Sequence, residues 1–492
     1  MLSLFLPLLP LLAASTNPGL RTSIHESSLQ NFVAAYIPQL LASVQVHGLG
    51  PVSFPLNLYI AHLTFNVTHT TFAELQVNMQ ETALEMDADN QTIWLKIRGL
   101  DMDLESDFKY HTLATGWTDG KFYLYMEGAS LTIPVTIGVD AEGKLDCKIA
   151  PIEQNFLDME YQFSTDSYLM DILAFLGSVP PFNYVDTLIT NLLFAKSLST
   201  LGTQMHQFLQ TLPYQAAIGP MSVDYHFYKF NITKDSYLEA AINGTIYPTG
   251  TTVAVPYTPP ETDSWLTEKE FRLQISQYTM DSLAWAVYES GFLQVNVTVS
   301  MLPTSVPFAL STTGLAMLLP QLIKTYGPKK PVELRCQASQ LPLLTVASLL
   351  DASLYGLCDV VVHVNSSTEA LAMTLQLQID TQANFSLYSS SKASYVIGAF
   401  NTSATQLSQF AYTVTNIGPV DLSSLKIAFS TLIKLAAGVV NARYFSQGVV
   451  LPLPAGVLLS NPSAQAEATT IELAAQPSFT LLVQRLVNEL FT

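Results

Sequence analysis

Residue patterns that signal enzymatic chemistry are absent from this sequence. It has no G-x-S-x-G nucleophile elbow, no H-E-x-x-H zinc motif and no glycine-rich phosphate loop. The eight histidines are scattered, and no pair has the spacing of a metal site on a helix. They are His25, His47, His62, His69, His111, His206, His226 and His363. We therefore expect neither enzyme activity nor a cofactor, and a hydrolase is the least favoured interpretation.

Two polar groups resemble reactive sites, but each has a simpler explanation. Asp224 and His226 lie two residues apart without a nucleophile motif near them, which is typical of ordinary surface residues. Asp101, Asp103 and Glu105 form a candidate cation cluster. Because they alternate with apolar residues, they are better explained as the solvated face of one strand. The sequence therefore predicts no metal site.

The three cysteines predict one disulfide. An odd number leaves at least one thiol without an intramolecular partner. Cys336 and Cys358 lie in neighbouring strand-like segments, so a cross-strand disulfide between them is expected. No C-x-x-C spacing occurs, and a metal role for Cys147 or the other two is not expected.

Several features predict export from the cell. Residues 1–14 are apolar, contain two prolines and end in small residues, so residues 1–15 are interpreted as a signal peptide cut near Ser15. Asn461 is followed by proline and is excluded as a glycosylation site, but eight Asn-X-Ser/Thr sequons remain, where roughly three would arise by chance. These predicted sites are Asn66, Asn90, Asn231, Asn243, Asn296, Asn365, Asn384 and Asn401. A secreted, extracellular glycoprotein is expected.

The composition calls for a large apolar interior. Hydrophobic residues make up 49% of the chain and charged residues 12%. Beyond the N-terminal segment there is no run of about 18 apolar residues, so a soluble mature protein is expected. The net charge is −18, and residues 16–214 hold 8 Lys/Arg against 21 Asp/Glu. This acidity argues against nucleic acid as a partner.

The first half reads as helix, strands, helix. Apolar residues between Leu29 and Leu40 recur at helical spacing, and a longer helix is expected over Val185–Leu209. Between them, residues 55–163 alternate with period two. The apolar set moves from odd to even positions at Gly99, which predicts a β-bulge in a long bent strand. A strongly curved antiparallel sheet is expected.

The second half repeats this order after a connector. Residues 215–260 have strand character and end in a Pro/Thr-rich stretch that resembles a linker. A helix carrying Leu283 and Val287 is expected to begin at Asp281 or Ser282. Further helices are expected near 315–326 and over 422–440, after alternating strands. A curved sheet wrapped over a long apolar helix can leave a tubular interior, in which acyl tails gain about 0.8 kcal/mol per CH₂.

Four segments, in this order and spacing, resemble one known family. They are NPGL at 17–20, QTLP at 210–213, MDSLAWAVYESGFLQV at 280–295, and TNIGPV at 415–420 with the following helix and LPLPAGV at 451–457. The sequence is similar to the group containing bactericidal permeability-increasing protein, lipopolysaccharide-binding protein and cholesteryl ester transfer protein. The resemblance implies an α+β boomerang of two barrel-like domains, each a highly curved antiparallel sheet wrapped on long helices, joined by a central sheet.

The resemblance also implies a domain division and two lipid pockets. An N-terminal barrel would span residues 16–214, a central sheet and linker 215–262, and a C-terminal barrel 263–492. The implied lining of the first pocket is Phe32, Tyr36, Ile37, Leu40, Val185, Ile189 and Leu193. That of the second is Leu283, Val287, Leu432, Ala436 and Val439.

Two departures from the family pattern and one open alternative qualify this expectation. Cys147 matches one member of a family disulfide, but Phe194 stands where its partner should be, so that bond is expected to be lost. The basic tip of the antibacterial members is replaced by an acidic first half. The amphipathic tail 477–492 is either a lid on a pocket or a terminal helix packed on the sheet.

The favoured function is a secreted lipid-binding or lipid-transfer protein that holds phospholipid or another acyl lipid. Phospholipid or neutral lipid is the expected ligand, with membrane or lipoprotein surfaces as further candidate partners. The alternative is an innate-defence protein that binds lipopolysaccharide or bacterial membranes.

Overall fold

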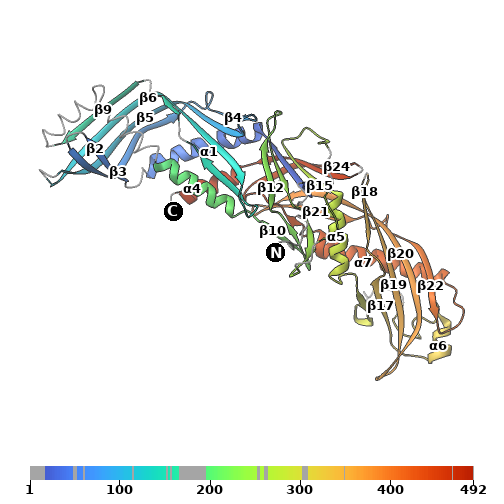
Figure 1. The fold of residues 1–492 in the computed structure, drawn as a ribbon. Coiled ribbons are helices and arrows are strands. Elements are labelled where there is room, and N and C mark those ends of the chain that lie inside the picture. Colours follow the sequence, from blue (N-terminus) through green and yellow to red (C-terminus); the bar gives the residue numbers. More distant parts are fainter. Residues whose placement is uncertain are drawn as a thin grey trace, which may run out of the picture.

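The protein is an elongated, bent α+β molecule, as the sequence predicts (Figure 1). The structure is a computed structural model. It describes residues 17–47, 52–58, 61–112, 116–150, 153–155, 158–165, 196–251, 255–259, 264–301, 309–347, 349–467 and 469–490. The predicted signal peptide lies outside these residues. All strand pairs among the described residues are antiparallel. One large sheet lies at each end of the molecule, and a third lies between them.

The first sheet occupies one end of the molecule. Its main path is β2 (Val52–Leu58), β3 (Ala61–Val77), β5 (Thr92–Thr112), β6 (Gly116–Val139) and β7 (Leu145–Ile149). Beside this path, β4 (Ala83–Asp87) pairs with β5, while β8 (Glu153–Asn155) and β9 (Asp158–Thr165) pair with β6. The long hairpin of β5 and β6 lies at the centre of this sheet. The side chains on one face of the hairpin are buried.

The predicted bulge at Gly99 is confirmed. The pairing of β5 with β6 shifts register between Ile97 and Leu100, and Gly99 has a positive φ of 61°. A side chain there would clash, because a Cβ on Gly99 would lie 2.8 Å from the Cβ of Asn78. The shift keeps Leu100, Met102 and the even positions beyond them on the buried face, which explains the change of phase in the sequence.

The central sheet brings both ends of the chain together. Its order is β12 (Phe227–Ile232), β13 (Tyr237–Ile242), β1 (Leu20–His25), β15 (Phe271–Ser276), β25 (Thr470–Ser478) and β24 (Leu458–Glu467). The sheet therefore draws four of its strands from outside residues 215–262. A small sheet of β10 (Gln215–Ile218), β11 (Met221–Asp224) and β14 (Ile246–Pro248) lies beside it, so the predicted strand character of the connector is confirmed.

A buried arginine ties the central strands to each other. Arg272 is 3% exposed, and its Nε donates to Ser23 Oγ at 2.7 Å. Its guanidinium lies 3.7 Å from the ring of Tyr237 and 4.2 Å from that of Trp265. Burial lowers the pKa of Arg272, and nearby Glu472, which is 1% exposed, opposes that shift. The cluster joins β1, β13, β15 and β25 across one face of the sheet.

The last sheet forms the other end. Its path is β16 (Val295–Val297), β17 (Val332–Ala338), β19 (Leu350–Asn365), β20 (Thr368–Ser389), β21 (Ser394–Phe400) and β23 (Val449–Val450). In addition, β18 (Leu343–Val346) pairs with β19, and β22 (Gln406–Thr415) pairs with β20. Cys336 and Cys358 face each other on β17 and β19 and form the predicted disulfide.

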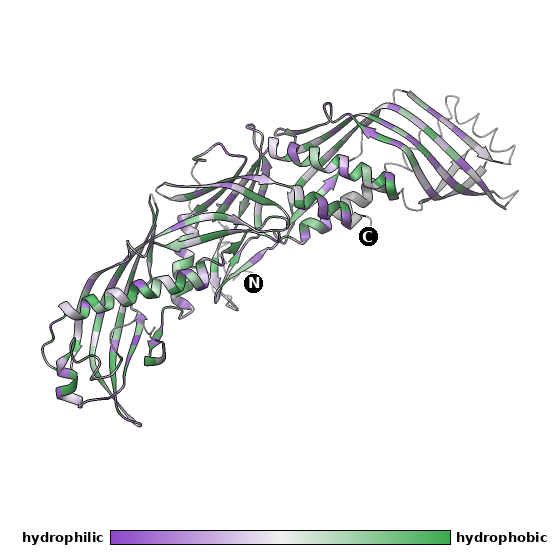
Figure 2. Cartoon of the chain, turned by 180° about the vertical axis from the view of Figure 1, so that it is seen from behind, coloured by the Kyte–Doolittle hydropathy of each residue, from purple (hydrophilic) through white to green (hydrophobic). Residues whose placement is uncertain are grey.

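The helices cover the inner faces of the sheets. Figure 2 shows α7 (Ser423–Val440) in front of the last sheet and α1 (Glu26–His47) in front of the first. The other helices are α4 (Lys196–Gln210), α5 (Gln277–Glu289), α6 (Pro320–Tyr326) and α8 (Thr480–Leu490). A short turn, η2 (Val299–Met301), follows β16, and η3 (Asn441–Phe445) extends α7.

Two helix boundaries differ from the sequence prediction. Asp281 and Ser282 do not cap α5, because the helix follows β15 directly and begins at Gln277. Residues 315–318 are turns, so α6 starts only at Pro320, a residue that favours the first helical turn. Of the long helix expected over Val185–Leu209, the described part begins at Lys196.

Candidate lipid-binding surfaces

The sheet-facing side of α7 loses its cover along the helix. Leu425, Phe429, Leu432, Ala436 and Val439 recur at intervals of three and four residues and therefore share one face. Leu425 and Phe429 are buried, and Leu432 is half-buried. Ala436 is exposed, and so is 57% of Val439. The apolar stripe thus continues past the point where the sheet covers it.

The burial of the inner face of β20 also decreases with distance from the tip, as far as Ile379. Met373 and Leu375 are fully buried near the end of the molecule, whereas Ile379 is only partly buried. Leu354, which pairs with Ile379 across β19 and β20, is partly buried as well. The sheet is therefore closed at the tip and less covered around Ile379 and Leu354, and it is buried again at Thr381 and Ala352.

At the closed end a small apolar pocket remains. Its free volume is about 10 Å³, close to the smallest volume that holds one water molecule. The rings of Phe429 and Phe410 lie 5.4 Å apart beside it. The pocket is lined by Leu310, Leu315, Leu318, Leu319, Leu334, Val360, Leu425, Ala428, Phe429 and Leu432. An acyl tail has no room here, so the accessible surface lies further along α7.

The far end of α7 is fixed to the sheet. The side-chain amide of Asn441 donates to the carbonyl of Phe400 at 2.8 Å and accepts from its backbone N–H at 2.8 Å. The rings of Phe445 and Phe400 lie 4.8 Å apart, and Tyr444 contacts Phe292 edge to face. The helix is therefore held at both ends, with its accessible apolar stretch between them.

The predicted residues of α1 divide between two environments. Ile37 is 5% exposed, and Leu40, one turn further, is half-buried. Phe32 and Tyr36 instead join the central core, where Phe32 meets Phe479 at 5.5 Å. Burial raises the pKa of Tyr36 to about 12. Burial therefore decreases along α1 towards the end of the molecule, whereas along α7 it decreases away from the tip.

The other predicted lining residues are not brought together with α7. Leu283 and Val287 are half-buried on α5 and pack in the central core, whereas Leu432 lines the pocket at the tip. Helical spacing cannot distinguish these two surroundings, because α5 and α7 both carry an apolar stripe. Val185, Ile189 and Leu193 lie outside the described residues.

The C-terminal helix α8 packs against α1. Leu482 is 5% exposed and Val483 is fully buried, while Leu486 and Val487 are partly buried against the central core. The first turns of α8 are thus part of the core. Whether its last turns cover a pocket remains a hypothesis.

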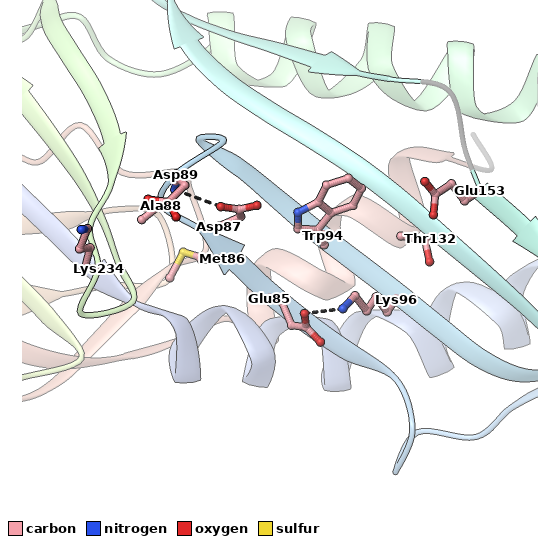
Figure 3. A pocket seen from close by; sticks show the side chains of 10 residues that line it. All are labelled: Glu85, Met86, Asp87, Ala88, Asp89, Trp94, Lys96, Thr132, Glu153 and Lys234. Carbon is pink, nitrogen blue, oxygen red and sulfur yellow. Dashed lines mark hydrogen bonds and ion pairs between the residues drawn. The ribbon is translucent and has the colours of Figure 1, made fainter.

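An open polar depression lies on the outer face of the first sheet (Figure 3). Its volume is about 750 Å³. Trp94 stands at its centre, and Lys96 forms an ion pair with Glu85. The lining residues are Glu85, Met86, Asp87, Ala88, Asp89, Trp94, Lys96, Thr132, Glu153 and Lys234. This mainly polar surface does not suit acyl chains.

The polar groups singled out in the sequence are engaged in structural contacts. His226 Nδ1 lies 2.5 Å from Asp224, whose carboxylate also accepts from Asn243. On β5, Glu105 is ion-paired with Lys121 and Asp101 accepts the backbone N–H of Gly128. These contacts account for Asp224, His226, Asp101 and Glu105.

Sequence reasoning missed a second cluster with the donor set of a metal site. Glu333, His363 and Glu369 bring their ligand atoms within 4.8 Å of one another on β17, β19 and β20. Arg335 donates to Glu333 at 2.8 Å and to Glu369 at 2.9 Å, and its hydrogen bond lowers the pKa of Glu333. The guanidinium already supplies the positive charge that the carboxylates need.

The predicted glycosylation sites differ in accessibility. Asn90, Asn296, Asn365 and Asn384 are exposed, while Asn66, Asn231 and Asn401 are half-buried. Asn243 is also half-buried, and its side chain bonds both Asp224 and Thr245. Occupancy at Asn243 would require breaking these bonds.

Comparison with known proteins identifies the family. The model of the LBP / BPI / CETP family, C-terminal domain, matches residues 219–477, more than half of the chain. This chain belongs to the LBP/BPI/CETP family. The last sheet falls within the matched region, and so do the strands of the central sheet apart from β1 and the final residue of β25.

Relatives and solved structures agree with this assignment. The chain is 21% identical to human lipopolysaccharide-binding protein over 55% of this chain and 56% of that protein. It is 22% identical to rat bactericidal permeability-increasing protein over 70% of both chains. The chain thus spans about half the length of the lipopolysaccharide-binding proteins it matches. A crystal structure of lipopolysaccharide binding protein superposes with a TM-score of 0.56 at 17% identity, covering 94% of this chain and 99% of that one.

The LBP/BPI/CETP fold expected from the four motifs is therefore confirmed. One departure is visible as well: Cys147 is a buried free cysteine, and burial raises its pKa to about 11. Phe194, which stands at the position of its family partner, lies outside the described residues.

Proposed function

We propose that this protein binds acyl lipid without covalent chemistry, with the tails against the uncovered stripe of α7. The main supporting observation is that Ala436 and Val439 continue the buried stripe but are themselves exposed. A tail that covers this surface gains about 0.8 kcal/mol per CH₂. About twelve methylenes contribute roughly 10 kcal/mol, which is comparable to the association cost of about 4–15 kcal/mol.

A second tail site is proposed beneath α1. Ile37 is buried, and Leu40, one turn further along α1, is half-buried. Val185, Ile189 and Leu193 would complete this wall. In both sites the headgroup remains at the accessible end in water, so the ligand is a phospholipid or a neutral lipid that is released without bond cleavage.

The proposal includes the setting of the protein. Family membership, the absence of catalytic motifs and the sequons support a secreted carrier that exchanges lipid with membranes or lipoprotein surfaces. The two barrel-like units of 16–214 and 263–492 would each carry one site, joined through the central sheet.

Native mass spectrometry of the purified protein, with extraction of the lipid that copurifies, tests the proposal. The double variant A436D/V439D places charge on the uncovered stripe and should lose the adduct of the last unit. The control S424D adds a carboxylate to an exposed position in the first turn of α7, where it favours the helix dipole, and should keep the adduct. Equal lipid content in both variants, or wild-type protein without lipid, would contradict the proposal.

Lipopolysaccharide recognition is the second candidate function. Relatives named lipopolysaccharide-binding protein and bactericidal permeability-increasing protein favour it. The excess of 21 Asp/Glu over 8 Lys/Arg in residues 16–214 disfavours strong contact of that half with an anionic glycolipid. Saturable lipopolysaccharide binding, with leakage of bacterial-lipid vesicles, would favour this alternative over carriage.

A further inference from the structure

The side of α7 that points away from the sheet is apolar as well. Ile427 and Leu435 lie outside the sheet-facing stripe, and their exposed fractions are 71% and 37%. Met317, in the turns before α6, is 94% exposed. Large apolar side chains with this exposure, grouped at one end of a molecule, are typical of a contact surface.

The same region is basic in an otherwise acidic protein. Residues 290–332 contain no Asp or Glu, and neither do residues 422–466. Asp421 is the single acidic residue between positions 381 and 466. The cations of these segments are Lys324, Lys329, Lys330, Lys426, Lys434 and Arg443. This local excess contrasts with the net charge of −18 for the whole chain.

The lysines of this region are accessible. Lys324, Lys426 and Lys434 are exposed. Within the described ranges, none of these three side chains has a carboxylate within 4.0 Å. Their charge is therefore available to an external partner.

The apolar and basic groups belong to one end of the fold. Figures 1 and 2 both show α6 beside the start of α7 at the tip of the last sheet. Gln321 on α6 donates to the carbonyl of Pro419, just before α7, at 2.9 Å. Leu318, next to Met317, and Ala428, next to Ile427, line the same small pocket. The exposed residues therefore project from packed neighbours.

We infer that this tip of the last sheet, formed by residues 315–326 and the outward side of α7, docks on bilayers that contain anionic phospholipid. Met317, Ile427 and Leu435 enter the interface, while the lysines meet phosphate groups. A protein partner would need a surface that is apolar and acidic over the same area. An anionic bilayer has an apolar interior and negatively charged headgroups over its whole surface. Met317 and Ile427 lie outside the proposed tail sites, whereas Leu435, one turn before Val439, borders the site on α7.

The geometry favours a helix lying on the membrane surface. Among the described helices, Ser423–Phe445 is long and apolar enough to cross a bilayer. However, Leu425 and Phe429 are buried against the sheet, and Asn441 is hydrogen-bonded to β21. Spanning would require removing these contacts, whereas surface docking keeps them.

Vesicle cosedimentation tests the inference. Wild-type protein should bind vesicles of equal parts phosphatidylglycerol and phosphatidylcholine, bind pure phosphatidylcholine weakly, and dissociate as salt increases. The variant K324Q/K426Q/K434Q should bind the anionic vesicles on the order of 100-fold more weakly. The control K109Q/K121Q/K148Q changes the net charge equally at the other end and should bind like wild type. Equal weakening in both triple variants would refute the assignment to this tip.

A second pair of variants tests the apolar contribution. M317Q/I427Q should bind anionic vesicles at least about 10-fold more weakly, because two large apolar side chains no longer enter the interface. V46Q removes an equally exposed apolar residue from α1 and should have no effect. Unchanged binding by M317Q/I427Q, or binding to lipopolysaccharide micelles without binding to phospholipid vesicles, would overturn the inference. Far-ultraviolet circular dichroism and lipid content by native mass spectrometry show that each variant is folded and loaded.

Discussion

Replacing Arg272 with methionine should strongly destabilise the protein. Methionine keeps much of the side-chain volume but removes the hydrogen bonds to Ser23 Oγ and to the Thr267 carbonyl, at 2.7 and 3.1 Å. It also removes the cation over Tyr237 and Trp265. Removing one partner of a buried charge network costs about 3–5 kcal/mol, since the remaining charge loses its compensation. The contact with the rings accounts for up to about 2 kcal/mol of that.

Thermal unfolding followed by circular dichroism measures this effect. With an unfolding entropy of about 2.1 cal/mol/K per residue over one cooperative body, a loss of about 3–5 kcal/mol corresponds to a decrease in Tm of roughly 3–5 °C. The control is R335M: the side chain of Arg335 is 38% exposed, and the buried Glu333 keeps His363 as a partner when Arg335 is removed. A solvent-exposed cation of this kind contributes about 1 kcal/mol or less.

A second substitution separates charge from packing. Glu472 is 1% exposed and accepts from the Leu266 backbone and Thr267 hydroxyl. In the R272M background, E472Q removes the uncompensated charge and should restore about 1 kcal/mol or more. Strictly additive losses in R272M/E472Q, or a loss in R272M no larger than in R335M, would refute the account of Arg272 as the charge that balances the central sheet.

Four further predictions follow from other parts of the fold. F429A should lower the free energy of unfolding by about 3–5 kcal/mol, as measured by urea denaturation, because it opens a cavity beside a closely packed pocket; a loss below about 1 kcal/mol would show that α7 collapses onto the sheet. Cys147 should resist alkylation at neutral pH in the native protein, since burial raises its pKa to about 11, and should react after unfolding; rapid labelling of native protein would contradict its burial. The pKa of Glu333 is lowered in the folded state. Its stabilising contribution is therefore present above the unfolded pKa of about 4.3 and disappears as the pH falls through the folded value. E333Q and wild type should differ in Tm at neutral pH and converge in acid, and a difference that is constant with pH would contradict this. Deleting residues 484–492 removes the last two turns of α8, including Leu486 and Val487 at the edge of the central core, and should increase the lipid-exchange rate if these turns form a lid; unchanged exchange with unchanged folding would support simple packing.

Local patterns predicted much of the fold. The change of phase at Gly99 located the bulge because a one-residue shift exchanges the two faces of a strand. The pairing of Cys336 with Cys358 followed from two adjacent strand patterns. The helix over 422–440 was found from its apolar spacing, which the structure reproduces as Ser423–Val440.

Contacts between segments distant in the sequence were harder to predict. Leu283 and Leu432 lie on similar apolar stripes, yet one packs in the centre and the other near the tip, because periodicity gives a buried face but not its neighbour. The cluster around Arg272 could not be found either, since Ser23 and Arg272 are separated by 249 positions. Ala436 and Val439 show that an apolar stripe also does not reveal whether its cover is complete.

The composition of the central sheet has a consequence for the order of events during synthesis. Strand β1 is made early, but its neighbours β13 and β15 follow only after more than 200 further residues, and β25 joins β15 near residue 471. Until then β1 has two unpaired edges, which are prone to associate with other chains. Because most of these contacts are distant in sequence, folding should be slow and completed after most of the chain has been made. The two ends of the molecule are therefore expected to fold as one cooperative body, and either half expressed alone would expose an edge that the other half normally covers.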